Sequence, residues 1–493
     1  MSALPFDALL VANRGEIALR IIRTAKRLGL RTVVVAHEAD HGSPATAAAD
    51  VVVPIHGKTG VAAYLDGAQI IDAARKTGAG AIHPGYGFLS ENAAFARAVA
   101  QAGIAFVGPT PEAIDLMGDK VRARAFVANK GFPVAPSAIE DDDPATFVAR
   151  ARALGAPLLV KPSAGGGGKG MRIVRDMAVL EQEIAQARSE GERYFGDGRL
   201  YVERFVEQPR HIEVQVMGDA HGTVVHLGER ECSVQRRFQK IVEETPSPGL
   251  SADERRRICD AAAGIARAAG YRNAGTVEFI YGRGEFYFLE MNTRLQVEHP
   301  VTEMVTGIDL VEAQLRVAAG ERLTFAQNDI RSNGHSIELR IYAESASRGF
   351  TPTTGSVLAL RLPSGEGVRV DIGIAEGQRV TTNFDPMLAK LIVHAPDRGE
   401  AIARARKALA DFALLGCETN IGFLDRLVAD PAFAAGEVHT GWLDANPALA
   451  ADPEIAPDLR RRLVAIAALA TRAIRDGADA VPPLYAAMGG WRN

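Results

Sequence analysis

The chain has few of the residues that mark several large protein classes. Its 493 residues include only three cysteines, Cys232, Cys259 and Cys417, which lie far apart and without C-x-x-C spacing. They predict neither a disulfide framework nor a zinc site, and a reducing, cytoplasmic location is expected. No uninterrupted apolar run reaches about 18 residues, so no membrane span is predicted. The start, M-S-A-L-P-F-D, lacks the basic segment of a signal peptide and the arginines of a transit peptide.

The chain also lacks a strong excess of charge. A net charge of −4 favours neither nucleic acid nor an anionic membrane as a partner. With 47% hydrophobic and 24% charged residues, the composition is that of an ordinary globular protein. A chain of this length is too long for a single hydrophobic core, so two to four domains are expected.

The N-terminal residues alternate between apolar strands and amphipathic helices. This pattern predicts a parallel α/β unit. The predicted elements are strands at 8–12, 31–36, 80–83 and 104–108 and helices at 17–28, 64–77 and 92–102. The loop His83–Asn92 follows a strand end, where such sheets often bind ligands. It is equally well explained as a turn whose Ser90 or Asn92 caps the next helix.

A glycine-rich segment, Pro162–Met171, follows a predicted buried strand at 157–161. It matches G-x-G-x-x-G, but the residues after it, 171–174, predict a strand and not the helix of a dinucleotide fold. It is not a Walker loop, because Gly170 and not Ser or Thr follows Lys169. We therefore expect a strand–loop–strand flap over phosphates, with Lys161 and Lys169 supplying charge. The alternative is a flexible solvent loop. The acidic run 140–143 is expected to be a solvated helix start.

Two segments concentrate polar residue types: Cys232–Glu244 (C-S-V-Q-R-R-F-Q-K-I-V-E-E) and Glu290–Glu303 (E-M-N-T-R-L-Q-V-E-H-P-V-T-E). The predicted hairpin of strands 276–281 and 285–291 turns near Arg283 and brings Glu278 nearly opposite Glu290 on one face. Like charges in cross-strand register are unfavourable unless a cation lies between them. Mg²⁺ takes one or two carboxylates plus substrate phosphates, and Asn292 adds an oxygen. Two solvated carboxylates are the alternative, which a buried opposite face of Phe279, Tyr287, Leu289 and Met291 disfavours.

Other strands carry alternating patterns. In 211–216, His211, Glu213 and Gln215 alternate with apolar residues, which predicts one polar and one buried face. In 334–344, Glu338 and Arg340 share one face and Ile337, Leu339 and Ile341 the other. Short strands up to 393 suggest a small β-rich domain, and helices are predicted at 400–414, 421–428 and 458–475.

At this point the chain resembles biotin carboxylase, the ATP-grasp component of biotin-dependent carboxylases. The resemblance extends from about Ala8 to Trp442. Besides the two polar segments it rests on A-N-R-G-E-I-A at 12–18, H-P-G-Y-G-F-L-S-E-N at 83–92, M-G-D-K at 117–120, G-G-G-G-K-G-M at 165–171 and R-H-I-E-V-Q-V at 210–216. Each motif alone is weak, but this set in this order is specific.

The resemblance implies an α/β ATP-grasp fold with an N-terminal parallel α/β domain and a C-terminal β-rich biotin carboxylase domain. The implied domains are 1–115, 116–330 with a glycine-loop lid at about 134–206, 331–447, and a helical tail or linker at 448–493. The implied substrates and cofactors are ATP, Mg²⁺ (or Mn²⁺), bicarbonate and carrier-bound biotin. The implied partners are a biotin carboxyl carrier protein or domain, a carboxyltransferase subunit and, in a homodimer, a second copy of the chain.

The resemblance also implies a role for each matching site residue. The residues implied to bind ATP are Lys120, Lys161, Gly167, Gly168, Glu203, Arg204, Phe205, Val206, His211 and Gln235. The metals would be held by Glu278, Glu290 and Asn292. Bicarbonate would be held by Lys240, Arg294, Gln296 and the amide of Val297. Glu298 would be the base that deprotonates bicarbonate, and Arg340 would stabilise the enolate-like ureido oxygen of biotin.

Two positions depart from the family's pattern. Phe238 stands where a histidine or asparagine is common, and we expect it to pack under the glycine loop rather than to face the nucleotide. Arg27 replaces an acidic residue that supports the dimer of the stand-alone bacterial subunit, whereas Arg23 is retained. The homodimer is therefore in doubt.

Three functions remain open from the sequence: a biotin carboxylase, another ATP-grasp ligase of the carbamoyl-phosphate synthase type, and a non-catalytic regulatory homologue. We prefer the first. No A-M-K-M biotin-attachment sequence is present, and the ending G-G-W-R-N resembles the G-W-R segment of longer acyl-CoA carboxylase α subunits. The chain is thus expected to be a stand-alone subunit or, preferably, part of such an α subunit.

Overall fold

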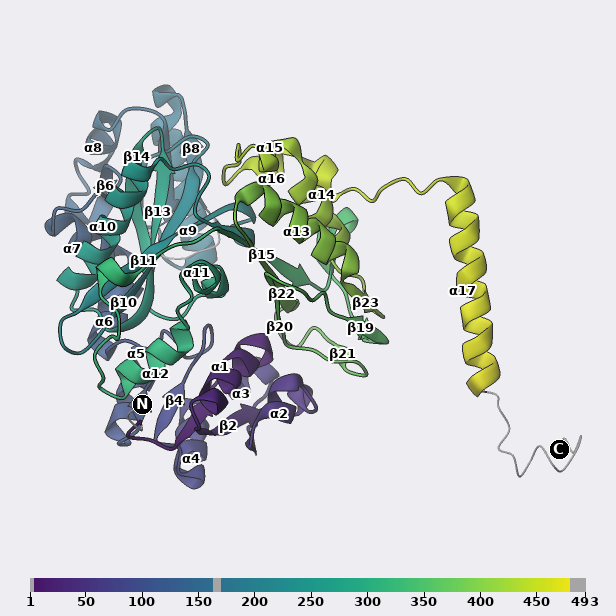
Figure 1. The fold of residues 1–493 in the computed structure, drawn as a ribbon. Coiled ribbons are helices and arrows are strands. Elements are labelled where there is room, and N and C mark those ends of the chain that lie inside the picture. The colour runs from purple at the N-terminus through teal and green to yellow at the C-terminus, as the bar shows by residue number, and fades with distance from the viewer. Residues whose placement is uncertain (1–3, 163–169, 479–493) are drawn as a thin grey trace, which may run out of the picture. The chain divides into compact units, whose positions relative to one another are not determined.

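The structure, a computed structural model, describes residues 4–162 and 170–478 (Figure 1). The chain divides into two units, residues 1–450 and 451–493. The predicted phosphate-binding Gly167 and Gly168 lie outside the described residues.

A parallel sheet opens the first unit, in the order β3-β2-β1-β4-β5. Its strands are β1 (Ala8–Val11), β2 (Arg31–Ala36), β3 (Val51–Pro54), β4 (Ala81–His83) and β5 (Ala105–Phe106). Its helices are α1 (Gly15–Arg27), α2 (Pro44–Ala48), α3 (Gly60–Tyr64), α4 (Gly67–Thr77) and α5 (Ala93–Gln101). The predicted parallel α/β unit is confirmed. The edge strand β3 was not predicted, and the helix predicted at 64–77 begins at Gly67, because Asp66 caps α4.

The largest sheet is antiparallel and has eight strands, in the order β14-β13-β10-β11-β12-β15-β22-β20. The strands are β10 (Arg210–Gly218), β11 (Val224–Arg236), β12 (Gln239–Thr245), β13 (Asn273–Gly282), β14 (Glu285–Asn292), β15 (His335–Tyr342), β20 (Val368–Ile372) and β22 (Met387–Ala395). The C-terminal region is rich in strands, as predicted. Its long strands are not a separate sheet, however, since β12 pairs with β15. One sheet therefore continues from the predicted ATP-grasp domain into the predicted C-terminal biotin carboxylase domain.

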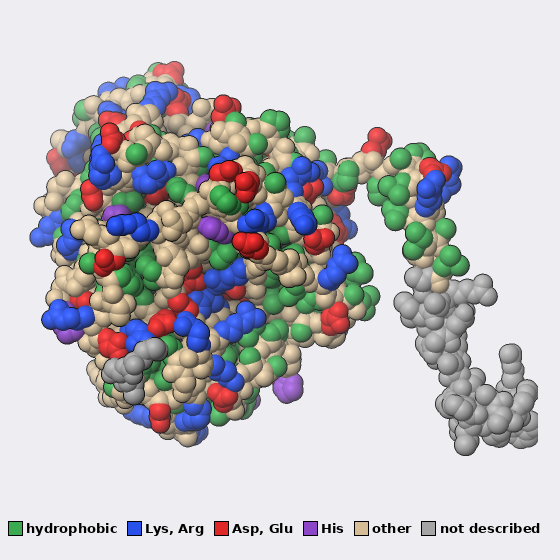
Figure 2. Space-filling model, viewed as in Figure 1, with side chains coloured by type: hydrophobic (Ala, Val, Ile, Leu, Met, Phe, Trp, Pro, Cys, Tyr) green, Lys and Arg blue, Asp and Glu red, His purple; other side chains and the backbone are tan. Residues whose placement is uncertain are grey.

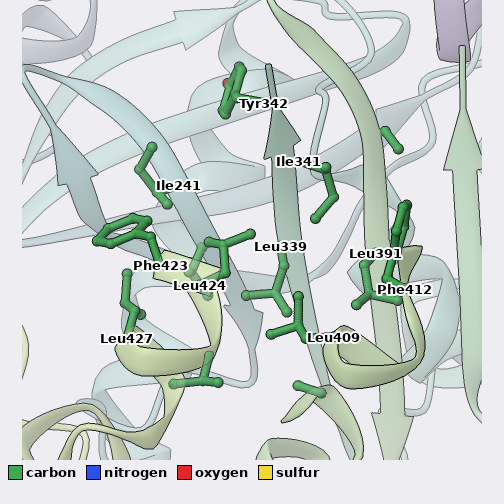
Figure 3. Close-up of a cluster of buried hydrophobic side chains, with 14 of the residues drawn as sticks. Ile241, Leu339, Ile341, Tyr342, Leu391, Leu409, Phe412, Phe423, Leu424 and Leu427 are labelled. Carbon is green, nitrogen blue, oxygen red and sulfur yellow. The ribbon is translucent and has the colours of Figure 1, made fainter. Parts of the chain in front are cut away.

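Helices and short strands complete this part of the fold. The helices are α6 (Pro111–Gly118), α7 (Lys120–Asn129), α10 (Ala252–Ala268), α11 (His299–Thr306), α12 (Leu310–Ala318), α13 (Arg398–Asp411), α14 (Ile421–Ala429), α15 (Pro431–Ala434) and α16 (Trp442–Ala445). The short strands are β16 (Glu344–Ser345), β17 (Thr351–Pro352), β18 (Gly355–Ser356), β19 (Ala359–Arg361), β21 (Arg379–Val380) and β23 (Ala413–Leu415). Figure 3 shows how β15 meets α13 and α14, with Leu339 facing Leu409 and Leu424. The apolar face predicted for β15 is thus buried in a core.

A four-stranded sheet, in the order β6-β9-β7-β8, has its own core with α8 (Phe147–Ala153) and α9 (Leu180–Phe195). Its strands are β6 (Ser137–Ile139), β7 (Leu158–Pro162), β8 (Arg172–Val174) and β9 (Leu200–Arg204). β7 and β8 pair antiparallel on either side of the glycine-rich segment, so the two strands of the predicted flap are confirmed. The solvated start predicted at 140–143 is wrong for Glu140. Its buried carboxylate pairs with Arg188 and accepts the N–H of Leu200 at 3.0 Å.

The second unit contains α17 (Pro457–Ala478), which agrees with the helix predicted at 458–475. Among the residues that the structure describes, no helix has both the length and the apolar content to cross a membrane. In the face shown in Figure 2, acidic and basic side chains are interspersed, as the small net charge leads one to expect.

Candidate active site

The paired carboxylates predicted from the hairpin are present. Glu278 of β13 is in direct register with Glu290 of β14. The register arises from a bulge, because Phe279 pairs with Phe288 and Leu289 is left as the extra residue. The bulge also explains two wrong predictions: Tyr287 and Leu289 were expected in the buried face with Phe279, but Tyr287 pairs with Ile280 on the other face and Leu289 is 38% exposed. Without it, Glu278 would face Leu289.

Each of the two carboxylates already has cationic or amide partners. Glu278 Oε1 accepts from Lys240 Nζ at 2.9 Å and from Asn292 Nδ2 at 2.9 Å. Glu290 Oε2 lies 2.9 Å from Lys120 Nζ. Burial alone would raise the pKa of Glu278, but Lys240 and His211 hold it well below its usual range. Two carboxylates and the amide group of Asn292 are a donor set that fits Mg²⁺.

The predicted base, Glu298, is buried between two cations. Its Oε1 accepts from Lys240 Nζ at 2.6 Å, and its Oε2 accepts from Arg340 Nη2 at 3.0 Å. Burial opposes ionisation, but Lys240, Arg340 and Arg230 keep the pKa of Glu298 well below its usual range. The structure therefore brings together Lys240, Glu298 and Arg340, which come from β12, the start of α11 and β15.

Beneath this group lies an ion pair that the sequence analysis did not identify. Arg230 is fully buried, and its Nε donates to Glu213 Oε1 at 2.5 Å. Glu213 Oε2 in turn accepts from Lys240 Nζ at 2.6 Å. Glu213 had been assigned to a polar face of β10 opposite a buried one, but both faces are buried. The alternation in β10 was the available signal for Glu213. It carries no information about Arg230, the partner of Glu213 on β11.

Arg294 lies on the same face as Asn292, as the alternation predicted. Its Nη2 donates to Asn292 Oδ1 at 3.0 Å, and its Nη1 donates to Gln296 Oε1 at 2.6 Å. Glu91 was not predicted as a site residue, yet its Oε2 accepts from Arg294 Nε at 2.9 Å. Asn92, one of the two predicted caps, does cap α5. The loop 83–92 thus both caps a helix and orients a site arginine.

The described residues assigned to ATP lie on the four-stranded sheet or just after its strand β9, on the neighbouring strands β10 and β11, and at the start of α7. Lys161 on β7 pairs with Glu203 on β9, and the Lys120 side chain is 65% exposed. The N–H of Phe205 donates to Pro157 O at 2.9 Å. Arg204 Nη2 donates to Leu154 O at 3.3 Å. Val206, the last of this run, is half-buried.

His211 and Gln235 lie together beside the carboxylates. His211 Nε2 is 2.8 Å from Glu278 Oε2, and its Nδ1 is 3.5 Å from Gln235 Nε2. The Lys240 ammonium sits among Glu213, Glu278 and Glu298, so this part of the carboxylate cluster already holds a cation. The side nearer Glu290 is therefore the better place for a metal.

Phe238 occupies the tight turn between β11 and β12. Arg236 pairs with Gln239, and both turn residues, Arg237 and Phe238, have positive φ, 48° and 67°. Histidine and asparagine accept this conformation more readily than phenylalanine. Phe238 as a whole residue is 62% exposed. The glycine loop under which it was expected to pack lies outside the described residues, so that prediction stays open.

The arginines that bear on a dimer have partners within the chain. Arg27 Nη2 lies 2.7 Å from Asp309 Oδ2, and its Nη1 lies 2.8 Å from Glu312 Oε2. Arg23 Nη1 is 3.9 Å from Asp371 Oδ1. A surface pocket of about 420 Å³ lies beside Arg23, and its charged lining residues are Arg20, Arg23, Arg369, Glu303, Asp309 and Asp371.

Three protein families match successive parts of the chain. They are described as biotin carboxylase, N-terminal domain (residues 5–114), carbamoyl-phosphate synthase L chain, ATP binding domain (residues 119–326) and biotin carboxylase C-terminal domain (residues 338–445). Together they cover most of the first unit.

Individual relatives agree. The chain is 50% identical over 443 residues to a biotin carboxylase of Halalkalibacterium halodurans, covering 89% of this chain and 97% of that protein. It is 48% identical over 442 residues to a mitochondrial methylcrotonoyl-CoA carboxylase subunit alpha of Oryza sativa subsp. japonica, covering 89% of this chain but only 60% of that protein.

A solved structure agrees as well. The biotin carboxylase domain dimer of the Hydrogenobacter thermophilus 2-oxoglutarate carboxylase, in complex with MgADP, ADP and bicarbonate, superposes with a TM-score of 0.84. The two share 44% identity over 91% of this chain and 99% of that one.

Proposed function

The chain belongs to the biotin carboxylase family, and on that premise we propose how its own side chains divide the reaction. It is an ATP-dependent ligase that uses MgATP and bicarbonate to carboxylate biotin. The carbamoyl-phosphate synthase alternative is wrong, because the domains on both sides of the ATP-binding domain match biotin carboxylase. The observation that carries the division of roles is the buried Glu298 between Lys240 and Arg340.

Glu298 is proposed as the base that removes the proton of bicarbonate. Bicarbonate is a poor nucleophile and needs both positioning and a base near the γ-phosphate. Lys240, Arg294, Gln296 and the amide of Val297 are proposed to hold it. Support comes from the contact of Lys240 with Glu298 at 2.6 Å and from the contact of Arg294 with Gln296, two positions before the base, at 2.6 Å.

ATP is proposed to be held by Lys120, Lys161, Gly167, Gly168, the segment 203–206, His211 and Gln235. Glu278, Glu290 and Asn292 would hold Mg²⁺ (or Mn²⁺), which when bound neutralises charge on the phosphates. Lys120 pairs with Glu290, and Lys161 pairs with Glu203. Each ammonium group therefore has a carboxylate partner before ATP binds.

Attack of bicarbonate on the γ-phosphate yields ADP and carboxyphosphate, and the latter breaks down to CO₂ and phosphate. The phosphate is proposed to take the proton from biotin N1′, while Arg340 stabilises the resulting negative ureido oxygen. Arg340 also contacts Glu298 and Glu243, through Nη2 at 3.0 Å and Nε at 2.6 Å. It is thus held in one place next to the base.

The wider assembly is also a proposal. A biotin carboxyl carrier protein or domain would present biotin, and a carboxyltransferase would take the carboxyl group onward. The chain spans about 60% of the methylcrotonoyl-CoA carboxylase alpha subunits and almost all of the biotin carboxylases that it matches. We propose an acyl-CoA carboxylase of the α-subunit type. A homodimer, the predicted domain boundaries and a cytoplasmic location remain predictions.

Phosphate release with purified protein, MgATP, bicarbonate and free biotin tests the function. We expect ATP hydrolysis that requires bicarbonate and rises with biotin. Hydrolysis indifferent to biotin would contradict the assignment, and no hydrolysis at all, with ATP still bound, would favour a non-catalytic homologue.

A further inference from the structure

Two successive peptide groups next to the base are held from the buried side. Gln296 O accepts from His299 Nδ1 at 2.8 Å. Val297 O accepts from Lys390 Nζ at 2.6 Å. Neither His299 nor the Lys390 side chain is exposed to solvent. The backbone from Gln296 to Glu298 is therefore fixed by two groups that no role above has used.

The first of these contacts orients the amide of Val297. The Gln296–Val297 bond is trans, since the cis bonds of the described residues are at Pro157 and Pro246. In a planar trans peptide group the N–H points opposite to the C=O. Because the C=O faces His299, the N–H of Val297 faces away from it. This N–H is the backbone group proposed above to hold bicarbonate.

His299 can donate in only one way. Burial, together with the charges of Lys390, Arg20 and Arg369, holds its pKa well below its usual range, so the ring is neutral and carries one N–H. That proton must be on Nδ1, which faces a carbonyl. Nε2 is buried without a hydrogen-bond partner among the described residues, and its nearest carboxylate, Glu303, is 3.9 Å away. An apolar side chain would avoid that cost, so packing alone does not explain a histidine here.

We infer that His299 is a positioning residue for bicarbonate: by donating from Nδ1 to Gln296 O it aims the Val297 amide at the anion, and Lys390 holds the following peptide group in the same way. Neither residue touches a reacting atom. The inference rests on the proposed function, because it assumes that bicarbonate lies at the Val297 amide.

A pair of substitutions separates the two ring nitrogens. In His299→Asn the side-chain nitrogen can take the place of Nδ1, whereas in His299→Gln it reaches the place of Nε2. We expect His299→Asn to keep the bicarbonate KM within about threefold of wild type. For His299→Gln we expect a rise of roughly ten- to a hundredfold, the effect of losing one well-aimed hydrogen bond to an anion. The ATP KM should stay within about twofold in both, since no ATP contact is lost.

A third variant distinguishes a loss of positioning from a loss of stability. His299→Leu removes the unpartnered Nε2 together with the Nδ1 donor, so its melting temperature should not fall while its bicarbonate KM rises as in His299→Gln. Equal bicarbonate KM values for the Asn and Gln variants would overturn the inference. So would losses that follow the melting temperature or affect ATP equally. Wild-type protein is assayed alongside: if it lacks bicarbonate-dependent hydrolysis, the proposed function itself fails, and the inference with it.

Discussion

Charged side chains differ in burial and in number of ionic partners between two regions of the same site. Around the base, the side chains of Lys240, Glu298 and Arg340 are at most 13% exposed, and each has at least two ionic partners. At the edge proposed for MgATP, the Lys120 and Glu290 side chains are 65% and 30% exposed and pair with each other. The first region is fixed before substrate arrives, and the second can exchange partners.

The energetics explain the difference. A buried ion is tolerated only with several good partners, and breaking such a set typically costs about 3–5 kcal/mol. An exposed pair is worth about 0–1 kcal/mol. Lys120 and Glu290 can therefore separate at little cost, the lysine turning to a phosphate and the carboxylate to a metal. The base cluster cannot rearrange so cheaply, which suits a group that must hold a small anion in one geometry.

The largest effect is expected from Glu290→Lys, which tests the exchangeable region. A second cation beside Lys120 would repel both Mg²⁺ and that lysine. ATP cleavage should fall to background while the fold survives, because the Glu290 side chain is partly exposed. Circular dichroism and phosphate release on the same sample measure both.

Glu285→Lys is the matched control for that change. Glu285 lies on the same strand, is exposed and contacts Tyr287, outside the site. It should keep full activity. A folded Glu290→Lys protein that still cleaves MgATP would show that the paired carboxylates do not hold the metal.

Glu298→Gln tests the fixed region and comes next in size. The amide is nearly the same shape but cannot accept the proton, so biotin-dependent turnover should fall roughly 10²–10⁴-fold. The ATP KM should hardly change, since Glu298 contacts Lys240 and Arg340 and none of the residues proposed for phosphate. Steady-state kinetics with ATP and bicarbonate varied separately would check this. Near-normal turnover would remove Glu298 from the mechanism.

Phe238→His should have the smallest effect and sharpens the boundary between the regions. Histidine accepts the positive φ of this turn better than phenylalanine, so the melting temperature should not fall. If the imidazole reaches a phosphate, the ATP KM drops by up to roughly a hundredfold. Phe238→Asn, which also suits the turn, is the comparison. A clear loss of stability in both variants would instead support the packing that the sequence suggested.

The strand pattern, together with the hairpin turn near Arg283, predicted only part of the arrangement, since most site residues were implied by the family resemblance. It placed Asn292 with Arg294, Ile337 with Leu339, and Glu278 close to Glu290. What it missed depends on contacts between distant strands. Arg230 gives no sign in its own segment that it meets Glu213, and Glu91 reaches Arg294 across 203 positions of the chain. The bulge at Leu289 was missed because residues 286–289 are all apolar, and this continuous run hides the change of phase that an extra residue makes in a period-two pattern.

That bulge has a consequence for which length changes the chain can tolerate. Removing Leu289 would join Phe288 to Glu290 in a regular ladder and keep Glu290 opposite Glu278 and Asn292 opposite Thr276. Removing Met291 instead would move Asn292 to the opposite face of the strand, although no site residue had been altered. An insertion at the tip, beside Arg283 and Gly284, would lengthen only an exposed turn. Among natural variants of this hairpin, length should therefore vary at the tip or at the bulge and stay constant between Glu290 and Arg294.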